Sequence, residues 1–406
     1  MHDASVPRAA TLARQGSAAD LAAALAASRA DTLATFSAFA QALPGLEVPL
    51  RQDLNPPLWE LGHVGWFQER WTARVSQRAL GCQADPDAPL ASPLRPDADA
   101  LYDSGRVGHD ARWELALPSV GETRSDLAHQ LAATLALLPA ADGAAAALYF
   151  FRLVLLHEDM HHEAALYVAQ SLGVAIDDAR WQAAPLPPPP APLTLAAGEW
   201  QLGSEDKGFV FDNELRRRPL ALGDTTIDAQ VVRWAEFLPF VEQGGYGQDR
   251  WWTDDGLRWR MAVRAAAPRY LKREGASWLQ WRHGRWRPLD RAEAACHLTL
   301  HEAQAWCRWA GRRLPDEAEW ERAAVTAPGG FRWGDAWEWT ASPFTPYPGF
   351  RPHPYRDYSA PWFDGRPVLR GASFMTQPRM RHPRYRNFFP AWRNDVSAGF
   401  RSCALP

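Results

Sequence analysis

The strongest constraint on this chain is a His-Glu-x-x-His motif inside a long apolar stretch, residues 148–172, that is expected to form a helix. Residues four positions apart share one face of an α-helix, so His157 and His161 can bind one metal ion together. A third imidazole is available upstream, because His63 lies in a second apolar stretch that begins at Pro56 and Pro57. Three histidines on two helices predict a metal site within a helical bundle.

Four helical segments are expected in the first half of the chain, and they cover residues 18–43, 56–77, 121–138 and 148–172. Either Thr123 or Ser125 is a suitable N-cap for the third segment. Residues 1–17 are expected to be disordered, and residues 80–118, rich in Asp, Pro and Gly, to form a long loop. We therefore predict a four-helix bundle over residues 18–180, with its second and fourth helices providing the metal ligands.

A proline-rich segment, residues 181–192, is the clearest domain boundary in the sequence. After it the helical period fades, and short alternating pieces at 193–195, 199–202 and 368–370 indicate strands. Helices are expected at 299–310 and 317–324, and most of the 21 tryptophans lie in this half. The predicted fold class is therefore multidomain, an α bundle followed by an irregular α+β domain over residues 193–406.

Composition excludes several classes of partner. The chain has 406 residues and a formal net charge of −3, so neither nucleic acid nor an anionic membrane is favoured. The four cysteines are scattered without a C-x-x-C pair, which makes a disulfide framework unexpected. No secretory signal pattern and no long uninterrupted apolar run is present, so we expect a cytoplasmic protein without membrane partners.

The metal site has competing interpretations. The two histidines of the motif could be ordinary core residues, but the apolar surroundings would leave unpaired imidazoles without a reason. A zinc-protease interpretation would make Glu158 the general base, yet no characteristic third ligand follows the motif. Two histidines at this spacing suit any first-row metal. His297 and His301 are also four apart, and there a packed helix start is favoured over a second metal site.

Several ordered motifs of the second half carry a family resemblance. They lie at residues 198–204, 302–321, 337–342, 369–374 and 399–401. Together they resemble the formylglycine-generating-enzyme-like, or sulfatase-modifying-factor, domain, which has a C-type-lectin-like fold. The first half, with Pro-Pro-x-Trp-x-x-x-His and His-Glu-x-x-His, resembles the DinB-type four-helix bundle. In this order the two domains resemble the sulfoxide synthases of ergothioneine biosynthesis.

This resemblance implies a non-haem Fe(II) oxidoreductase that uses O2 to couple a sulfur donor to the imidazole of hercynine, the trimethylated betaine of histidine. It implies that His63, His157 and His161 bind the iron, and that Asn387 contacts hercynine. It also implies a tyrosine of the lectin-like domain as proton donor. Three tyrosines remain open for this role: Tyr347, Tyr355 and Tyr358.

The chain departs from the family pattern where the sulfur donor is held. Phe389 stands where the family has an Asp that binds the donor's amino group, and Met160 stands where a Gln is usual. Of the expected carboxylate-binding arginines, only Arg112 is an obvious candidate. Because an amino-acid donor would leave its charges unpaired, a neutral or sugar-like donor becomes plausible. The sequence resembles the selenoneine synthases, which use a selenosugar, and a divergent enzyme using cysteine or γ-glutamylcysteine stays equally open.

We expect the site at the junction of the two domains. Four aromatic residues could surround the trimethylammonium group: Trp66, Phe388, Phe389 and Trp392. Phe388 and Trp392 would serve equally well as core residues. Two functions of other classes remain, a metal-dependent thiol transferase or hydrolase using the bundle alone, and a non-catalytic protein that captures a betaine. Formylglycine generation is disfavoured, because it needs two nearby cysteines late in the chain and only Cys403 is there.

Overall fold

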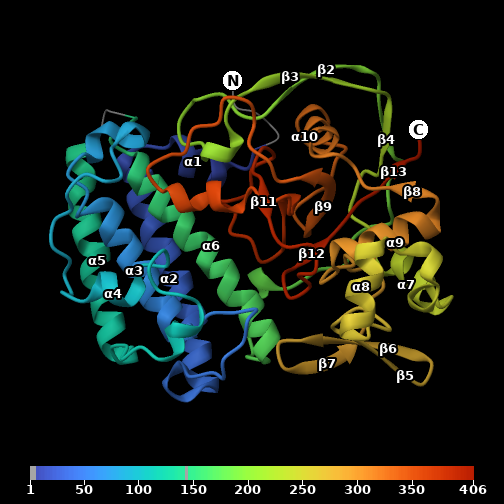
Figure 1. Cartoon of the computed structure of the whole chain (residues 1–406), viewed down its shortest axis with the longest axis horizontal. Coiled ribbons are helices and arrows are strands. Elements are labelled where there is room, and N and C mark those ends of the chain that lie inside the picture. The colour runs from blue at the N-terminus through green and yellow to red at the C-terminus, as the bar shows by residue number, and fades with distance from the viewer. Residues whose placement is uncertain (1–5, 142–144) are drawn as a thin grey trace.

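The computed structural model describes residues 6–141 and 145–406, and it has a helical half beside a mixed half (Figure 1). The helical half is a four-helix bundle, as the sequence predicts. Its helices are α2 (Ala18–Ala42), α3 (Pro57–Thr72), α5 (Val120–Ala141) and α6 (Tyr149–Leu172). Helix α6 lies on the side of the bundle that faces the second half (Figure 1).

Two predicted helix ends need correction. The second helix ends at Thr72 rather than near residue 77, because Val75 leaves the helix to form an isolated bridge with Leu90. The third helix begins at Val120, and its start is capped by Ser119 rather than by Thr123 or Ser125. The Ser119 hydroxyl accepts from the Glu122 amide at 3.3 Å, and the Glu122 carboxylate accepts from the Ser119 amide at 2.9 Å.

The N-terminal prediction is wrong for residues 8–15, which form helix α1 (Arg8–Gln15); residues 1–5 lie outside the described part. Arg14 is buried and donates two hydrogen bonds to the carboxylate of Glu214, at 2.7 and 2.9 Å. The partner of Arg14 in this bidentate pair lies far away in the sequence. Local composition gives no sign of the pair, and for that reason the sequence alone predicts disorder in this segment.

The loop between α3 and α5 contains more regular structure than expected. It holds η2 (Arg78–Gln83), α4 (Ala98–Tyr102) and η3 (Asp110–Trp113). Helix α4 packs on α3, with the indole of Trp59 donating to the Leu101 carbonyl at 2.7 Å. This contact places the end of α4 beside the histidine of α3.

The second half is built on two four-stranded sheets, with strand orders β1-β4-β13-β8 and β11-β10-β9-β12. Smaller sheets pair β2 with β3 and β5 with β6 and β7. The strands are β1 (Leu193–Leu195), β2 (Gly198–Leu202), β3 (Arg218–Leu222), β4 (Thr225–Ile227), β5 (Leu271–Glu274), β6 (Ser277–Arg282), β7 (Arg285–Pro288), β8 (Arg312–Arg313), β9 (Ala336–Pro343), β10 (Pro367–Ala372), β11 (Asn387–Phe388), β12 (Ala398–Gly399) and β13 (Cys403–Ala404). The three strand segments named from sequence are confirmed.

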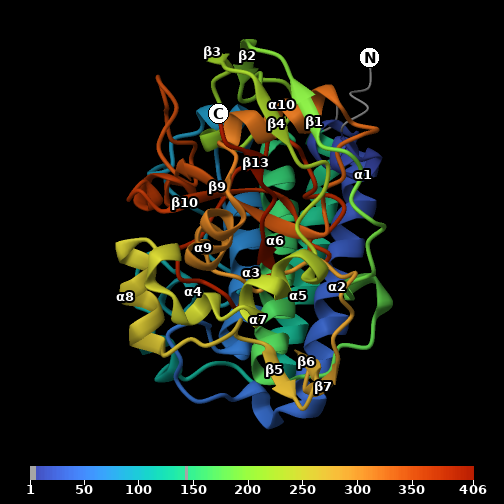
Figure 2. The same cartoon turned by 90° about the vertical axis from the view of Figure 1, so that its right-hand side faces the viewer.

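Helices and short 3₁₀ turns surround these sheets (Figure 2). The helices are α7 (Trp234–Glu242), α8 (Asp254–Val263), α9 (Leu300–Ala310) and α10 (Glu317–Thr326), which include the two predicted ones. The remaining 3₁₀ turns are η1 (Pro44–Leu46), η4 (Ala179–Trp181), η5 (Asp212–Glu214), η6 (Gly245–Gly247), η7 (Asp249–Trp251), η8 (Arg356–Tyr358) and η9 (Ala360–Trp362). Within the described residues, no helix is long and apolar enough to cross a membrane.

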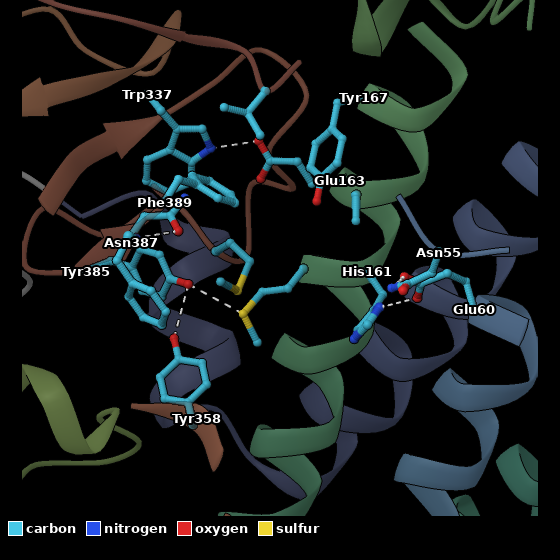
Figure 3. Close-up of a pocket in the computed structure, with 15 residues that line it drawn as sticks. Asn55, Glu60, His161, Glu163, Tyr167, Trp337, Tyr358, Tyr385, Asn387 and Phe389 are labelled. Carbon is cyan, nitrogen blue, oxygen red and sulfur yellow. Dashed lines mark hydrogen bonds and ion pairs between the residues drawn. The ribbon is translucent and has the colours of Figure 1, made fainter. Parts of the chain in front are cut away.

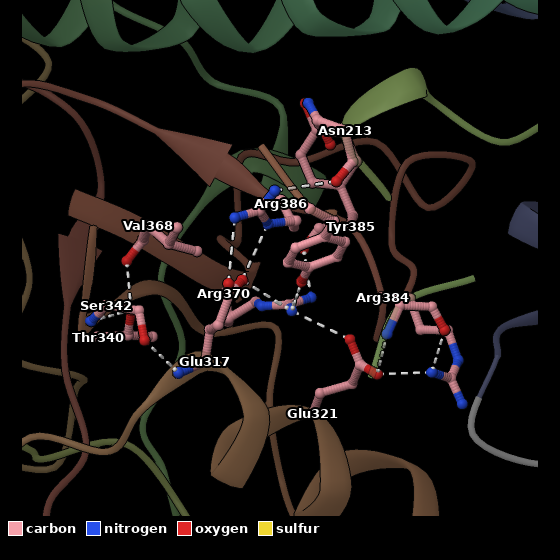
Figure 4. Close-up of polar contacts among 12 residues, drawn as sticks. Asn213, Glu317, Glu321, Thr340, Ser342, Val368, Arg370, Arg384, Tyr385 and Arg386 are labelled. Atoms are coloured by element: carbon pink, nitrogen blue, oxygen red, sulfur yellow. Dashed lines mark hydrogen bonds and ion pairs between the residues drawn. The ribbon is translucent and has the colours of Figure 1, made fainter. Parts of the chain in front are cut away.

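A buried ion-pair network fixes the segment just before β11 (Figure 4). Glu317 of α10 accepts from Arg370 of β10 at 3.0 Å and from the Nε of Arg386 at 2.9 Å. Glu321 accepts from the same Arg370 at 3.0 Å and from Arg384. Because these arginines are tied to one helix, the following residues, which begin β11, are held in a defined position against α6.

The two halves share one hydrophobic core. A single cluster of buried residues runs from Leu25 and Phe150 in the bundle to Trp337 and Phe400 in the second half. Because the two halves pack against each other through this shared core, side chains from both are held in fixed relative positions, which a flexible linker would not achieve. The proline-rich residues 181–192 remain our proposed boundary between the domains.

Candidate functional site

The three histidines named from the sequence lie together. His63 of α3 and His157 and His161 of α6 each offer a ring nitrogen, and these atoms all lie within 4.8 Å of one another. Among the described residues no other group of three His, Cys, Asp or Glu side chains meets this spacing. His297 and His301, the second histidine pair in the sequence, therefore do not belong to such a group. The local helix spacing thus produces the expected arrangement, and one more helix completes it.

Hydrogen bonds fix which ring nitrogen is free in two of the three histidines. The Nδ1 of His63 donates to the Tyr102 carbonyl at 2.8 Å, and the Nδ1 of His161 donates to Glu60 at 2.6 Å. Both rings therefore keep an Nε2 lone pair. The Nε2 atoms of His157 and His161 are 3.2 Å apart. Two nitrogens bound to one ion at about 2.1 Å, near a right angle, would lie roughly 3 Å apart.

Burial makes two of these imidazoles good ligands. It lowers the pKa of His63 to about 3, with a further contribution from His161. Burial also lowers the pKa of His157 well below its usual value. Burial alone would raise the pKa of Glu60, but the adjacent His161 lowers it to about 2, so this carboxylate is ionised. An ionised partner that holds the far nitrogen of a ligand is the usual support of a metal-binding histidine.

Aromatic packing holds the rings in place. Phe67 stacks on His157 with ring centroids 3.4 Å apart, and Trp59 stacks on His63 at 4.8 Å. A ring fixed by both packing and a hydrogen bond cannot rotate away from its neighbours. The donor set of this cluster therefore fits a first-row metal ion.

The glutamate of the motif does not reach the cluster. Glu158 is 2% exposed, and Arg29 donates from Nε to its Oε1 at 2.7 Å and from Nη2 to its Oε2 at 3.1 Å. The zinc-protease interpretation needs this carboxylate to activate a metal-bound water. Because both its oxygens are bound by a guanidinium, Glu158 is not free for that role.

Two connected cavities open beside the histidines. The inner cavity has a volume of about 280 Å³ and the outer one about 820 Å³. Met160, His161 and Phe389 line both, so the two are continuous. The inner cavity lies between α6 and the sheet that contains β9, β10 and β11, and Asn387 and Phe389 face His161 across it (Figure 3).

The structure brings most of the predicted substrate-binding residues to these cavities. Those that line the inner cavity are Met160, Asn387, Phe388 and Phe389. Arg112 and Trp392 line the outer cavity, where Trp392 is 48% exposed at the rim. Arg112 lies over the Trp59 ring at 4.0 Å and donates to Asn55 at 2.5 Å.

Two of the predicted residues do not line the cavities. Trp66 is buried next to His63, with ring centroids 5.5 Å apart, and its indole donates to Asp99 at 2.7 Å. Tyr347 packs beneath Arg386 at 4.1 Å, inside the ion-pair network of the second half. Neither side chain lines the inner or the outer cavity.

The other two tyrosines lie at the cavities. The ring of Tyr355 is 6.0 Å from that of His157, and burial raises the pKa of its hydroxyl, so it stays protonated at neutral pH. The Tyr358 hydroxyl donates to Tyr385 at 3.1 Å, and the Tyr385 hydroxyl donates to the sulfur of Met160 at 3.4 Å. Of the three candidate tyrosines, Tyr355 is thus the one whose ring lies beside a histidine of the cluster.

Sequence reasoning missed several residues of the site. Among them are Glu60, Glu163, Tyr167, Trp337 and Tyr385. The position of Glu163 two residues after the motif is a weak signal, and so is that of Glu60 three residues before His63. Their partners are more than a hundred positions away in the sequence, so neither contact could be inferred locally.

Comparisons with known proteins agree with this architecture. Residues 179–333 match the family model described as the sulfatase-modifying factor enzyme 1-like domain, which confirms the expected fold class of the second half. The chain is 30% identical over 402 residues to the hercynine oxygenase of Mycobacterium tuberculosis, covering 86% of this chain and 90% of that protein.

Two further relatives show where the likeness is complete and where it is partial. The hercynine oxygenase of Mycolicibacterium smegmatis is 29% identical over 409 residues, again covering 86% of this chain and 90% of the relative. The formylglycine-generating enzyme of Bos taurus is 33% identical over 147 residues, covering only 33% of this chain and 39% of its own. The first likeness spans both halves, whereas the second is restricted to a part of the chain.

Proposed function

This chain belongs to the hercynine oxygenase family, and from that premise we propose that it is an Fe(II)- and O2-dependent synthase acting on the imidazole of hercynine. The reaction would join a sulfur or selenium donor to the ring through a carbon–chalcogen bond. The observation that carries this proposal is the cluster of His63, His157 and His161 beside a cavity lined by both halves of the protein.

The donor set supports Fe(II) at the cluster. Three imidazoles suit this metal and leave further coordination positions for small ligands. When bound, Fe(II) would supply the oxidative chemistry that activates O2 and the donor. The protein's own contribution is to hold the three rings, through Tyr102, Glu60 and the stacked aromatic residues.

Replacing Glu60 by alanine is expected to weaken Fe(II) binding by about 10–100-fold, because His161 loses the partner that orients its ring. Glutamine, which keeps an acceptor oxygen, should weaken binding less than alanine. Competition with a chromophoric chelator under anaerobic conditions measures both affinities. If the wild type and both Glu60 variants bind Fe(II) equally well, then His161 does not bind the metal with support from its hydrogen bond to Glu60.

We place hercynine in the inner cavity and the chalcogen donor in the outer one. Asn387, Phe388 and Phe389 line the inner cavity near His161, so a betaine there would have its imidazole close to the cluster. Tyr355 lies beside His157 and lines the outer cavity, which suits the role of proton donor at the site. Of the three tyrosines, we propose Tyr355 for that role.

A selenosugar is our first choice of donor. Two of the three arginines of the outer cavity are already paired with carboxylates, Arg366 with Asp364 at 2.7 Å and Arg393 with Asp395 at 2.6 Å. The third, Arg112, donates only to neutral oxygens of Asn55 and Val107, so a single arginine is open to an amino-acid carboxylate. Trp362 and Trp392 instead offer exposed flat faces at the rim, 39% and 48% exposed, on which a sugar ring can lie.

A thiol such as cysteine or γ-glutamylcysteine is the second candidate, and the full-length likeness to hercynine oxygenases favours it. A transferase or hydrolase that uses the bundle alone is less well supported, because residues of the second half form one wall of the inner cavity. A non-catalytic betaine-binding protein would have no use for a three-histidine cluster next to that cavity.

The proposal is tested by aerobic incubation of Fe(II)-loaded protein with hercynine and one donor at a time, with products identified by mass spectrometry. The expected result is a hercynine adduct that requires O2 and forms from the selenosugar but not from cysteine or γ-glutamylcysteine. A sulfoxide from a thiol would instead assign the chain to the sulfur-using enzymes. The absence of an adduct from every donor would contradict the synthase proposal.

A further inference from the structure

The inner cavity has an unusual balance of charge. The ionisable acids and bases that line it, tyrosines aside, are Glu60, His161 and Glu163, and no arginine or lysine of the described residues lines it. Glu60 is already paired, since it accepts from His161 at 2.6 Å and from Asn55 at 2.6 Å. The cavity therefore has one carboxylate, that of Glu163, in excess of its basic groups.

The hydrogen bonds of Glu163 come from neutral groups alone. Its Oε1 accepts from the Trp337 indole at 2.8 Å, from the Ser373 hydroxyl at 2.6 Å and from the Thr376 hydroxyl at 2.9 Å. Arg381 is the basic side chain next to this group, but it donates to the carbonyls of Thr376 and Ser373, each at 3.2 Å. In the described part of the chain, Glu163 thus has no ion pair within 4 Å, although a buried carboxylate usually has one.

Aromatic rings surround this carboxylate. Figure 3 shows Glu163 between Trp337 and Tyr167, at the end of the cavity away from Tyr358. Phe389 lies on the same side of the cavity. Aromatic faces together with a carboxylate are the surroundings in which proteins hold quaternary ammonium groups, because the ring quadrupole and the negative charge act in the same sense. These surroundings suit a quaternary ammonium cation.

The inner cavity, rather than the helix spacing, brings Glu163 and His161 to one ligand site. Two residues are about 200° apart around an α-helix, but both of these side chains line the same cavity of about 280 Å³. A ligand whose imidazole lies near His161 can therefore extend through this cavity to Glu163. Hercynine has its trimethylammonium group a few bonds from its ring.

We propose that Glu163 is the counter-charge for the trimethylammonium group of hercynine and selects the quaternary betaine over imidazole acids that lack this cation. The inference rests on the proposed function, since it takes hercynine as the ligand of the inner cavity. It assigns a specificity role to the acidic residue that follows the metal-binding motif, distinct from metal binding and from donor choice.

Glu163→Gln tests this directly, because glutamine keeps an oxygen for the three neutral donors and removes only the charge. Dissociation constants are measured by anaerobic calorimetry on the Fe(II)-loaded protein for hercynine and for 3-(imidazol-4-yl)propionate, which lacks the trimethylammonium group. We expect the variant to bind hercynine at least about tenfold more weakly and the propionate with nearly unchanged affinity. Glu163→Asp, which keeps the charge, should retain part of the preference for hercynine.

Several outcomes would overturn the inference. Unchanged affinity of Glu163→Gln for hercynine would show that Glu163 is not the counter-charge. An equal loss of affinity for both ligands would show that its role is purely structural. If Glu163→Gln does not fold, the wild-type comparison decides, because equal affinity for the two ligands excludes selection by charge. A wild-type protein that binds neither ligand would overturn the proposed function as well, which separates that failure from a failure at Glu163 alone.

Discussion

Replacing His157 by alanine is expected to abolish stoichiometric Fe(II) binding and product formation together. The loss should exceed the ~10–100-fold weakening that removal of an outer partner typically causes, because a ligand atom itself is removed. His157 is central to the cluster, with its Nε2 3.2 Å from that of His161 and its ring stacked on Phe67. Metal analysis after desalting and mass spectrometry of the reaction mixture measure the two effects.

A matched control separates ligand loss from damage to the bundle. His129 is an exposed histidine of α5, and His129→Ala should keep both metal content and turnover. Circular dichroism and thermal unfolding show whether each variant keeps its helices. If folded His157→Ala retains stoichiometric Fe(II) and normal turnover, then the three-histidine cluster is not the catalytic metal site.

Replacing Arg29 by methionine is expected to destabilise the protein by about 3–5 kcal/mol, since it leaves a buried carboxylate without its partner. Arg29 of α2 binds both oxygens of Glu158 on α6, and its Nη2 also donates to Gln68 of α3 at 2.8 Å. Its Nη1 donates to the Leu127 carbonyl of α5 at 2.6 Å. One side chain thus joins all four helices of the bundle. Urea unfolding followed by circular dichroism measures the free energy of unfolding.

The control for this variant is Arg124→Met on α5, where an exposed arginine donates to the Ser37 hydroxyl. Its free energy of unfolding should change by no more than about 0.5 kcal/mol. A double variant, Arg29→Met with Glu158→Leu, should recover much of the stability, because it removes the unpaired charge as well. A change of less than about 1 kcal/mol for Arg29→Met would show that Glu158 is not held as an ion in the bundle.

The metal cluster was the part of the site most accessible from sequence. Helix periodicity alone places His157 and His161 on one face, and an apolar stretch after two prolines indicates the helix of His63. The fold class followed from the same periodicity and from ordered motifs in the second half. These signals are local or depend on order along the chain, so a single sequence contains them.

The surroundings of the cluster could not be predicted because they depend on contacts distant in sequence. Glu60 contacts a histidine 101 residues later, and Glu163 accepts from an indole 174 residues later. Trp59 and Trp66 lie on the same helix near His63, and only packing decides that Trp59 stacks on the ring while Trp66 faces Asp99. A residue's type tells what it can bind, but its tertiary neighbours determine what it does bind.

The central claim is that Fe(II) is held by the three histidines with hercynine in the inner cavity beside it. Its most direct test is a crystal structure of the protein grown anaerobically with Fe(II) and hercynine, with anomalous scattering recorded at the iron edge. We predict one anomalous peak at about 2 Å from a ring nitrogen of each of His63, His157 and His161, with the trimethylammonium group next to Glu163. An iron peak elsewhere, or a betaine bound outside the inner cavity, would contradict the account.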